Sequence, residues 1–238
     1  MEADWITIDG VEPSARIRGK LTEQPVALAF SRGKDAIAAW LALREAGVQV
    51  KPYYFYLVPG LMRFEAESLD YFEGFFGQRI ARYPHPSIYR WLNRYTFQAP
   101  ERLALIEAAR LPEPSYSDMQ RMILQDWGWP ADTWFADGVR AADSPNRRAS
   151  IKKHGPMKSH SHKVSPIWDW RRKHTFQVMA DHGVTVPVDY AWFGRSFDGI
   201  DKRFTGPLSR LAPDDYQKLL EWYPLADLDQ LRYTLEAR

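Results

Sequence analysis

Residues 25–47, PVALAFSRGKDAIAAWLALREAG, decide the fold of this chain. They open with an unbroken apolar run at 26–30, which predicts a strand buried on both faces of a parallel sheet. Apolar residues then recur at helical spacing as far as Gly47, which stands where a helix commonly ends. The glycine-containing loop at 31–35 and the helix start after it bring backbone N–H groups and the positive end of a helix dipole together. The stretch therefore predicts an anion site, most naturally for phosphate.

The common nucleotide-binding loops do not describe this turn. A Walker A loop requires Lys followed by Ser or Thr, whereas Lys34 is followed by Asp35. The dinucleotide fingerprint G-x-G-x-x-G follows none of the predicted strands. The loop alone does not exclude an ordinary strand-to-helix turn that binds no ligand.

Composition restricts the class of protein. The chain has 238 residues, 45% of them apolar, which suits a globular α/β domain. No apolar stretch approaches the roughly 18 residues of a membrane span, and the acidic N-terminus has no signal pattern, so we expect a cytoplasmic protein without a membrane partner. The net charge of +2 gives little support to a nucleic-acid partner, although it does not exclude one. The absence of cysteine excludes disulfides, iron–sulfur clusters, thiolate zinc sites and a cysteine nucleophile.

Periodicity and turn residues predict the remaining elements. We expect an N-terminal extension at 1–24, a helical insertion at 84–130 and a helical C-terminus at 201–238, whose apolar faces suit a protein partner or self-association. Strands are predicted at 5–8, 48–58, 79–83 and 134–136, helices at 64–76, 89–111, 117–127, 171–182, 213–222 and 227–236, and irregular chain at 12–24.

A second charged motif, DGVRAADSPNRR at 137–148, follows the predicted strand at 134–136. Arginines at the carboxyl edge of a sheet present planar forks to phosphate or sulfate oxygens, and open α/β sheets bind ligands at that edge. Residues 144–163 hold six Lys or Arg, three His and no acid. This basic segment is either a solvated loop or a mobile lid over a polyphosphate. Its histidines are poor metal-ligand candidates, because no carboxylate accompanies them.

Four segments together resemble a known family. Residues 31–36 (SRGKDA) resemble the S-G-G-x-D-S loop of the adenine nucleotide α-hydrolase, or PP-loop, superfamily. Residues 138–147 match the G-x-R-x-x-[ED]-S-x-x-R segment of its PAPS reductase branch, and 164–170 (VSPIWDW) and 186–194 are similar to later segments of that branch. The resemblance implies a single domain over residues 1–238, with a doubly wound, mostly parallel α/β sheet.

The chain also departs from the family pattern. Arg32 replaces the first Gly of the loop, which is tolerable where that residue needs no positive φ, and Ala36 replaces the final Ser. The cysteine that PAPS reductases use as nucleophile is missing, so thiol–sulfonate exchange lacks its thiol unless a partner supplies one.

The resemblance implies an enzyme that binds ATP or a related adenine nucleotide, cleaves at the α-phosphate, releases pyrophosphate and adenylates a second, unidentified substrate. A PAPS-binding protein that borrows a thiol and a catalytically silent nucleotide-binding module are the alternatives. The catalytic residues implied are Lys34, Asp35, Arg140 and Arg147, and Asp35 and Asp137 would hold Mg²⁺. The nucleotide-binding residues implied are Phe30, Ser31, Arg32, Gly33, Tyr56, Leu57, Gly138, Asp143, Ser144 and Arg148.

Overall fold

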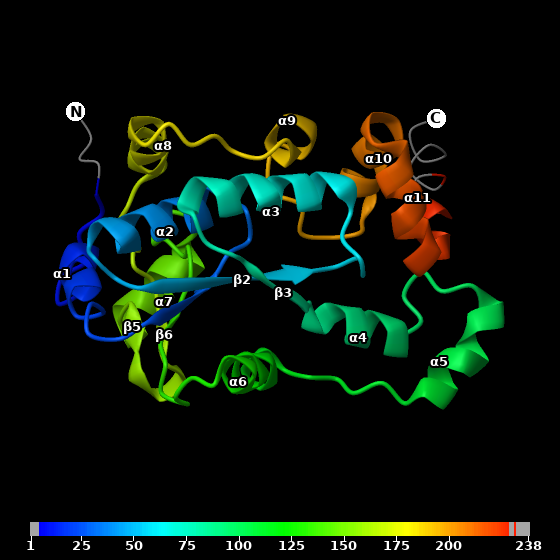
Figure 1. Ribbon diagram of the computed structural model, residues 1–238, viewed down its shortest axis with the longest axis horizontal. Helices are drawn as coiled ribbons and strands as arrows, with labels where there is room; N and C mark the ends of the chain where they lie inside the picture. Colours follow the sequence, from blue (N-terminus) through cyan, green and yellow to red (C-terminus); the bar gives the residue numbers. More distant parts are fainter. Residues whose placement is uncertain (1–4, 229–230, 232–238) are drawn as a thin grey trace. The chain divides into compact units, whose positions relative to one another are not determined.

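The computed structural model describes residues 5–228 and residue 231, and it has a mixed α/β architecture (Figure 1). Its six-stranded sheet has the order β3-β2-β1-β4-β6-β5. β1 runs parallel to β2 and to β4, β4 runs parallel to β6, and only the β5–β6 pair is antiparallel among the pairs with a described register. The strands are β1 (Val26–Ala29), β2 (Val50–Tyr56), β3 (Ala81–Pro84), β4 (Phe135–Ala136), β5 (Met157–Lys158) and β6 (Lys163–Val164).

The position of β1 creates a switch point in the sheet. From β1 the chain first adds β2 and β3 on one side, and it then returns to place β4 on the other side. Ala27 therefore pairs with Lys51 on one neighbour and with Phe135 on the other. Ligands in open α/β sheets bind beyond the carboxyl ends of the strands at such a point. Here that place lies between the ends of β1 and β4.

Helices connect and flank these strands. α2 packs against β1 and against α8, and Gly47 follows α2 with a positive φ of 78°, as its place at a helix end predicts. The helices are α1 (Ser14–Gly19), α2 (Lys34–Glu45), α3 (Arg63–Phe76), α4 (Pro86–Asn93), α5 (Leu103–Ala109), α6 (Tyr116–Trp127), α7 (Pro145–His154), α8 (Arg172–Asp181), α9 (Asp189–Phe193), α10 (Lys202–Leu211) and α11 (Pro213–Trp222). Single 3₁₀ turns occur at Pro100–Arg102, Ser159–Ser161 and Pro224–Ala226.

The chain divides into two compact units, each built from alternating segments. Unit 1 comprises Met1–Tyr54, Glu73–Ala81 and Gly128–Val186, and unit 2 comprises Phe55–Phe72, Arg82–Trp127 and Pro187–Arg238. The core of unit 1 surrounds β1 and α2, where the Trp40 ring stacks on Phe76 with centroids 3.7 Å apart. Unit 2 has its own core, in which Phe64, Phe197 and Phe204 are buried. The prediction of one domain over residues 1–238 stays a prediction, since each unit is discontinuous in sequence.

Several local predictions are wrong. Residues 12–24 are not wholly irregular, because they contain α1, and the helix predicted at 89–111 is broken into α4 and α5. The basic segment 144–163 is not a loop, since it forms α7, β5 and β6. The strand predicted at 5–8 is reduced to one isolated antiparallel β-bridge, between Trp5 and Trp170.

The segment predicted as a helical insertion contains α4, α5 and α6, and the C-terminal region contains α10 and α11. Most of the helix predicted at 227–236 lies outside the described residues. No helix in the described part of the chain is long and apolar enough to cross a membrane.

Candidate functional site

The turn from β1 into α2 forms the first wall of the site. Gly33 is the N-cap residue, with an extended backbone, and its carbonyl accepts the first helical hydrogen bond, from the Ile37 N–H at 3.0 Å. The N–H groups of the first turn have no acceptor within the helix, and the helix dipole adds positive potential there. The turn predicted from the sequence thus has the backbone geometry of an anion site.

The segment after β4 forms the second wall, and Gly138 brings it against the start of α2. A Cβ atom at position 138 would lie 2.7 Å from the carbonyl carbon of Asp35 and 2.9 Å from the amide nitrogen of Ala36. Real Cβ atoms do not approach backbone that closely, so only glycine fits without a backbone shift. The two sequence motifs therefore meet in space.

Five charged side chains of alternating sign join the two motifs. Lys34 Nζ lies 2.6 Å from Asp35 Oδ2, and Arg140 Nε lies 3.0 Å from Asp35 Oδ1. On its other side, Arg140 Nη2 donates to Asp143 Oδ1 at 2.5 Å, and Arg147 Nη1 donates to Asp143 Oδ2 at 2.6 Å. We call this row of three cations and two carboxylates the ion chain. It carries a net charge of +1, and it lies beyond the carboxyl ends of β1 and β4.

Arg140 holds the centre of the ion chain. Its side chain is only 3% exposed, and its Nη1 also donates to Thr175 Oγ1 of α8 at 2.9 Å. A buried guanidinium needs compensating charge, because an uncompensated buried charge costs about 3–5 kcal/mol. The Nε of Arg140 lies within ion-pair distance of Asp35 but makes no hydrogen bond to a described residue. Arg140 therefore acts as a positioning residue for Asp35 and Asp143, whereas Lys34 and Arg147 are more exposed. Direct contact between Arg140 and a phosphate stays a prediction.

Arg32 does not meet the condition under which its replacement of glycine is tolerable. Its φ is +61°, in the left-handed region that disfavours residues with a Cβ by about 1–2 kcal/mol. The side chain is 0% exposed, and its guanidinium carbon lies 5.3 Å from the centroid of the Tyr54 ring. The cation–π contact offsets part of the backbone cost, whereas burial of the guanidinium adds to it. Residues held in strained conformations concentrate at functional sites.

Asp137 is the carboxylate best placed to accept a hard cation. Its Oδ1 accepts hydrogen bonds from the Val139 N–H at 3.0 Å and the Ser165 hydroxyl at 2.8 Å. Burial raises the pKa of Asp137, although those hydrogen bonds and the nearby Lys158 and Lys163 act in the opposite direction. No described residue forms an ion pair with it.

These residues fit Mg²⁺ in a limited way. Mg²⁺ in polyphosphate sites uses one or two protein carboxylates together with phosphate oxygens, and Asp137 satisfies that need. Asp35 is already neutralised by Lys34 and Arg140, so a metal ion at Asp35 would have to displace a cation. No group of three or more His, Asp or Glu within the described residues could hold a metal by protein ligands alone.

Four other predicted residues of unit 1 do not belong to the ion chain. Ser31 is exposed, and Ser144 caps α7 by accepting a hydrogen bond from the Arg147 N–H at 3.2 Å. Arg148 is exposed and forms no ion pair with any described residue. Phe30 is a core residue, with its ring 5.1 Å from that of Trp40.

Tyr56 and Leu57 belong to unit 2. The Tyr56 carbonyl accepts from the His85 N–H at 2.9 Å, and the Leu57 carbonyl accepts from the Tyr223 hydroxyl at 3.1 Å. The backbone carbonyls of both residues thus already accept a hydrogen bond within the protein. Their role in nucleotide binding stays a prediction.

Two polar residues of the site escaped prediction from the sequence. Thr175 carried no signal, because a single threonine in a helical pattern is common and its partner Arg140 is 35 residues away. Ser165 lies inside the segment 164–170. Its hydrogen bond to Asp137 depends on the pairing of β6 with β4, which only the structure reveals.

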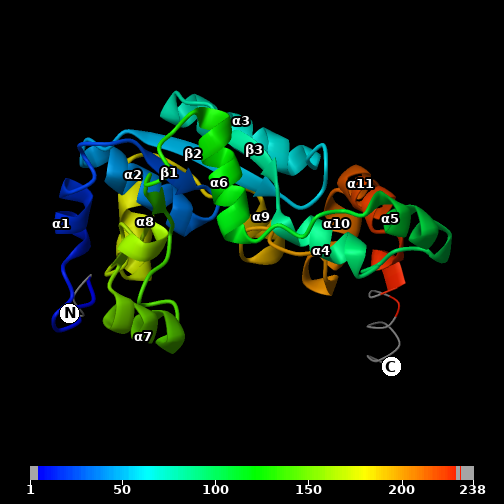
Figure 2. The ribbon, with the colours of Figure 1, turned by 90° about the horizontal axis from the view of Figure 1, so that it is seen from below.

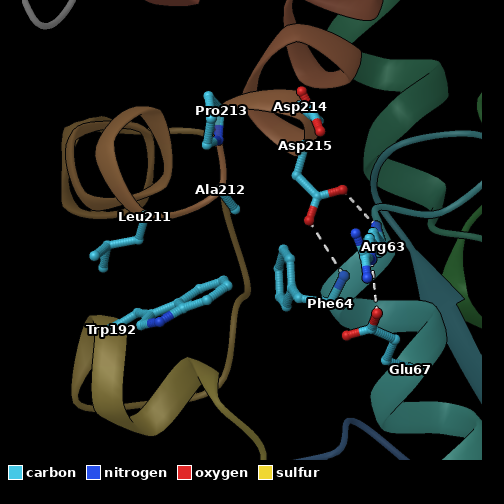
Figure 3. A pocket seen from close by; sticks show the side chains of 9 residues that line it. All are labelled: Arg63, Phe64, Glu67, Trp192, Leu211, Ala212, Pro213, Asp214 and Asp215. Carbon is cyan, nitrogen blue, oxygen red and sulfur yellow. Dashed lines mark hydrogen bonds and ion pairs between the residues drawn. The ribbon is translucent and has the colours of Figure 1, made fainter.

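Unit 2 has a cavity of about 280 Å³ at the N-terminus of α3 (Figure 3). Phe64, Trp192 and Leu211 provide apolar walls. The Asp215 carboxylate accepts from the backbone N–H groups of Arg63 and Phe64, at 3.2 Å from the latter, so it serves as the cap of α3. This cavity contains none of the residues that the sequence motifs predict.

Comparison with known proteins adds no assignment. The sequence matches no protein-family model, and no curated protein matches it significantly.

Proposed function

We propose that the protein binds ATP, with Mg²⁺, beyond the carboxyl ends of β1 and β4, as the substrate of an adenylating enzyme of the PP-loop type. The observation that carries the proposal is the ion chain, because it joins both predicted phosphate motifs at the switch point of the sheet. The strand order around β1 supports the same superfamily, whose doubly wound sheet binds its nucleotide at this place. The likeness of residues 31–36 and 138–147 to the family motifs supports it further.

In this proposal a nucleophile of the second substrate attacks the α-phosphorus. A bond forms between the nucleophile and phosphorus, the bond from phosphorus to the bridging oxygen of the β-phosphate breaks, and pyrophosphate leaves. Lys34, Arg147 and the amides of the first turn of α2 stabilise the phosphate charge. Asp35 and Asp143 hold the cations in place before the nucleotide binds. Asp137 would be one ligand of a bound Mg²⁺, which would supply neutralisation of the phosphate charge.

A catalytically silent nucleotide-binding module is the second candidate. It is favoured by Ala36, which gives the first turn of α2 no hydroxyl to contact a phosphate, and by the 2.6 Å pairing of Lys34 with its own neighbour Asp35. Both candidates require the same nucleotide site, and they differ only in whether the α-phosphate is attacked.

The decisive experiment measures binding and turnover separately. Calorimetry with ATP and Mg²⁺ should show binding that Lys34→Ala and Asp35→Ala each weaken by at least about tenfold, the scale of one charge-assisted hydrogen bond. Lys173→Ala is the matched control, since Lys173 is an exposed cation of α8 outside the ion chain. Unchanged ATP binding in both site variants would overturn the proposal.

Labelled ATP then separates the two candidates. Release of pyrophosphate with an equal amount of AMP, or of AMP joined to the nucleophile, supports the enzyme. Tight binding without either product, across candidate nucleophiles that include water, amines and carboxylates, supports the silent module.

A further inference from the structure

A second cavity, of about 330 Å³, lies in unit 1 between the N-terminal segment and residues 168–170. Its volume is in the range of small-ligand pockets, and its walls are mostly apolar, with Trp5, Trp168 and Trp170 among them. The segment 164–170 resembles a family motif, yet the proposed function uses only Ser165 from it. The cavity therefore has no role in the chemistry described above.

Hydrogen bonds hold the walls of this cavity in place. The Ile6 N–H donates to the Asp169 carbonyl at 2.6 Å, and the Trp168 indole N–H donates to the Glu12 carbonyl at 3.0 Å. Trp5 forms a bridge to Trp170. The N-terminal segment is thus attached at several points, and the cavity is formed without a ligand.

Asp169 brings an unsatisfied charge to this cavity. The residue lines the cavity and is only 7% exposed. Its Oδ2 accepts from the Ser14 N–H at 2.9 Å, whereas its Oδ1 is buried and has no hydrogen-bond partner among the described residues. A buried carboxylate oxygen without a donor is destabilising, so this position favours a ligand that supplies one.

Arg18 brings the opposite charge to the same cavity. Its Nη1 donates to Ser14 Oγ at 2.9 Å and to the Pro166 carbonyl at 2.6 Å, and its guanidinium carbon lies 5.5 Å from the centroid of the Trp170 ring. Burial lowers the pKa of Arg18, and Asp169 raises it, but a guanidinium remains charged near neutral pH. Its Nη2 and Nε donate to none of the described residues. A planar edge of the guanidinium is therefore left for an acceptor.

We propose that this cavity binds a zwitterionic amino acid with an apolar side chain. The ammonium group pairs with the Asp169 carboxylate, the ligand carboxylate accepts from the open edge of Arg18, and the side chain packs among the tryptophans. Because Arg18 and Asp169 sum to zero charge, a ligand with one charge of each sign keeps the cavity neutral, whereas a simple cation or anion adds an uncompensated charge to it. The inference does not rest on nucleotide binding at the ion chain.

Calorimetry with four probes tests the proposal in the absence of ATP. The probes are L-leucine, L-phenylalanine, phenethylamine, which lacks the carboxylate, and 3-phenylpropanoate, which lacks the ammonium group. We expect the wild-type chain to bind phenylalanine at least about tenfold more tightly than either single-charge analogue, as expected for one lost charged hydrogen bond. Equal affinity for phenylalanine and an analogue, or no binding of the amino acids at millimolar concentration, would overturn it.

Two near-isosteric variants locate the two ends of the ligand. Asp169→Asn should weaken phenylalanine binding about tenfold or more and leave 3-phenylpropanoate binding unchanged. Arg18→Gln should weaken phenylalanine binding similarly and leave phenethylamine binding unchanged. A uniform loss for all probes in both variants would contradict the assigned orientation.

A third variant keeps the test valid if loss of the hydrogen bond from the Ser14 N–H to Asp169 unfolds the chain. Ala15 is exposed and lines the cavity, so Ala15→Phe fills the space without removing a native hydrogen bond. It should abolish binding of the amino acids while the far-ultraviolet circular dichroism stays native. Ala149→Phe, at an exposed alanine of α7 outside the cavity, is the control and should bind as the wild type does. Normal phenylalanine binding by Ala15→Phe would overturn the proposal.

Discussion

Gly138 is the residue on which the approach of the two motifs depends. A methyl group there would meet backbone atoms of Asp35 and Ala36, which cannot rotate away as a side chain could. We expect Gly138→Ala to lower the free energy of unfolding by about 1–3 kcal/mol, as overpacking typically does, and to separate Arg140 from Asp35. Urea denaturation measures the first effect, and nucleotide calorimetry measures the second.

The control for this prediction is Gly74, an exposed glycine inside α3, where an added Cβ would have no heavy atom within 4 Å. Gly74→Ala should stabilise the protein by about 0.5–1 kcal/mol, because alanine loses less conformational freedom in a helix. Equal effects of the two substitutions would show that the close approach at Gly138 is unimportant.

At the scale of single residues, the sequence predicted which charged side chains lie together better than it predicted their conformation. Lys34, Asp35, Arg140, Asp143 and Arg147 come from two separate motifs, and the structure brings them into one chain of contacts. The positive φ of Arg32 was not predictable, because local preferences oppose it and the offsetting contact with Tyr54 arises only from the tertiary fold. The partnership of Arg140 with Thr175 is unpredictable for the same reason.

At the scale of elements, α7 concentrates the basic charge of the protein. Residues 144–163 contain six of the 32 Lys and Arg and none of the 30 Asp and Glu, so the rest of the chain carries a net charge of −4. α7 buries only Ile151, and it lies at the margin of unit 1 in Figure 2. The beginning of α7 was predictable from Ser144 and Pro145, and its end from Gly155. Its helical periodicity was not detectable in the sequence, because the helix has few apolar residues.

This charge distribution predicts that a polyphosphate protects α7 from trypsin. Cleavage at Arg148, Lys152 and Lys153 requires local opening of α7, which few buried contacts oppose and which repulsion among the cations favours. We expect rapid cleavage in the free protein, protection by ATP with Mg²⁺, and much less protection by adenosine. The protection should decrease with salt, because exposed charges are screened over a Debye length of about 8 Å at 0.15 M.

The exposed Arg110 in unit 2 provides an internal reference for this experiment, and its cleavage rate should not respond to ATP. Mass spectrometry of the early fragments separates the two positions. Identical rates at α7 with and without ATP would assign the basic segment to a solvated surface.

At the scale of the whole molecule, the absence of cysteine from all 238 residues predicts a chemical limit. Release of sulfite from PAPS requires a thiolate that attacks sulfur, and no side chain here can provide it. We expect the purified protein to release no sulfite from PAPS when a small-molecule thiol is the only reductant. Sulfite production above that of the thiol alone would contradict this expectation.

At this scale the α/β class and the positions of most strands and helices were predictable, because they rest on apolar runs and their spacing. The partition into two units was not, since each unit combines three segments of the chain. Nor was the antiparallel pairing of β5 with β6, because both strands are only two residues long.

The central place of β1 has a consequence for the synthesis of the chain. One edge of β1 pairs with β4, in which Phe135 lies opposite Ala27, so this edge has no strand partner until about 108 further residues have been made. At about 5–20 residues per second, a ribosome needs roughly 5–20 s for that distance. During this interval an apolar strand presents unpaired N–H and C=O groups, the condition that promotes association between nascent chains. Folding of this protein in the cell is thus timed by the arrival of β4.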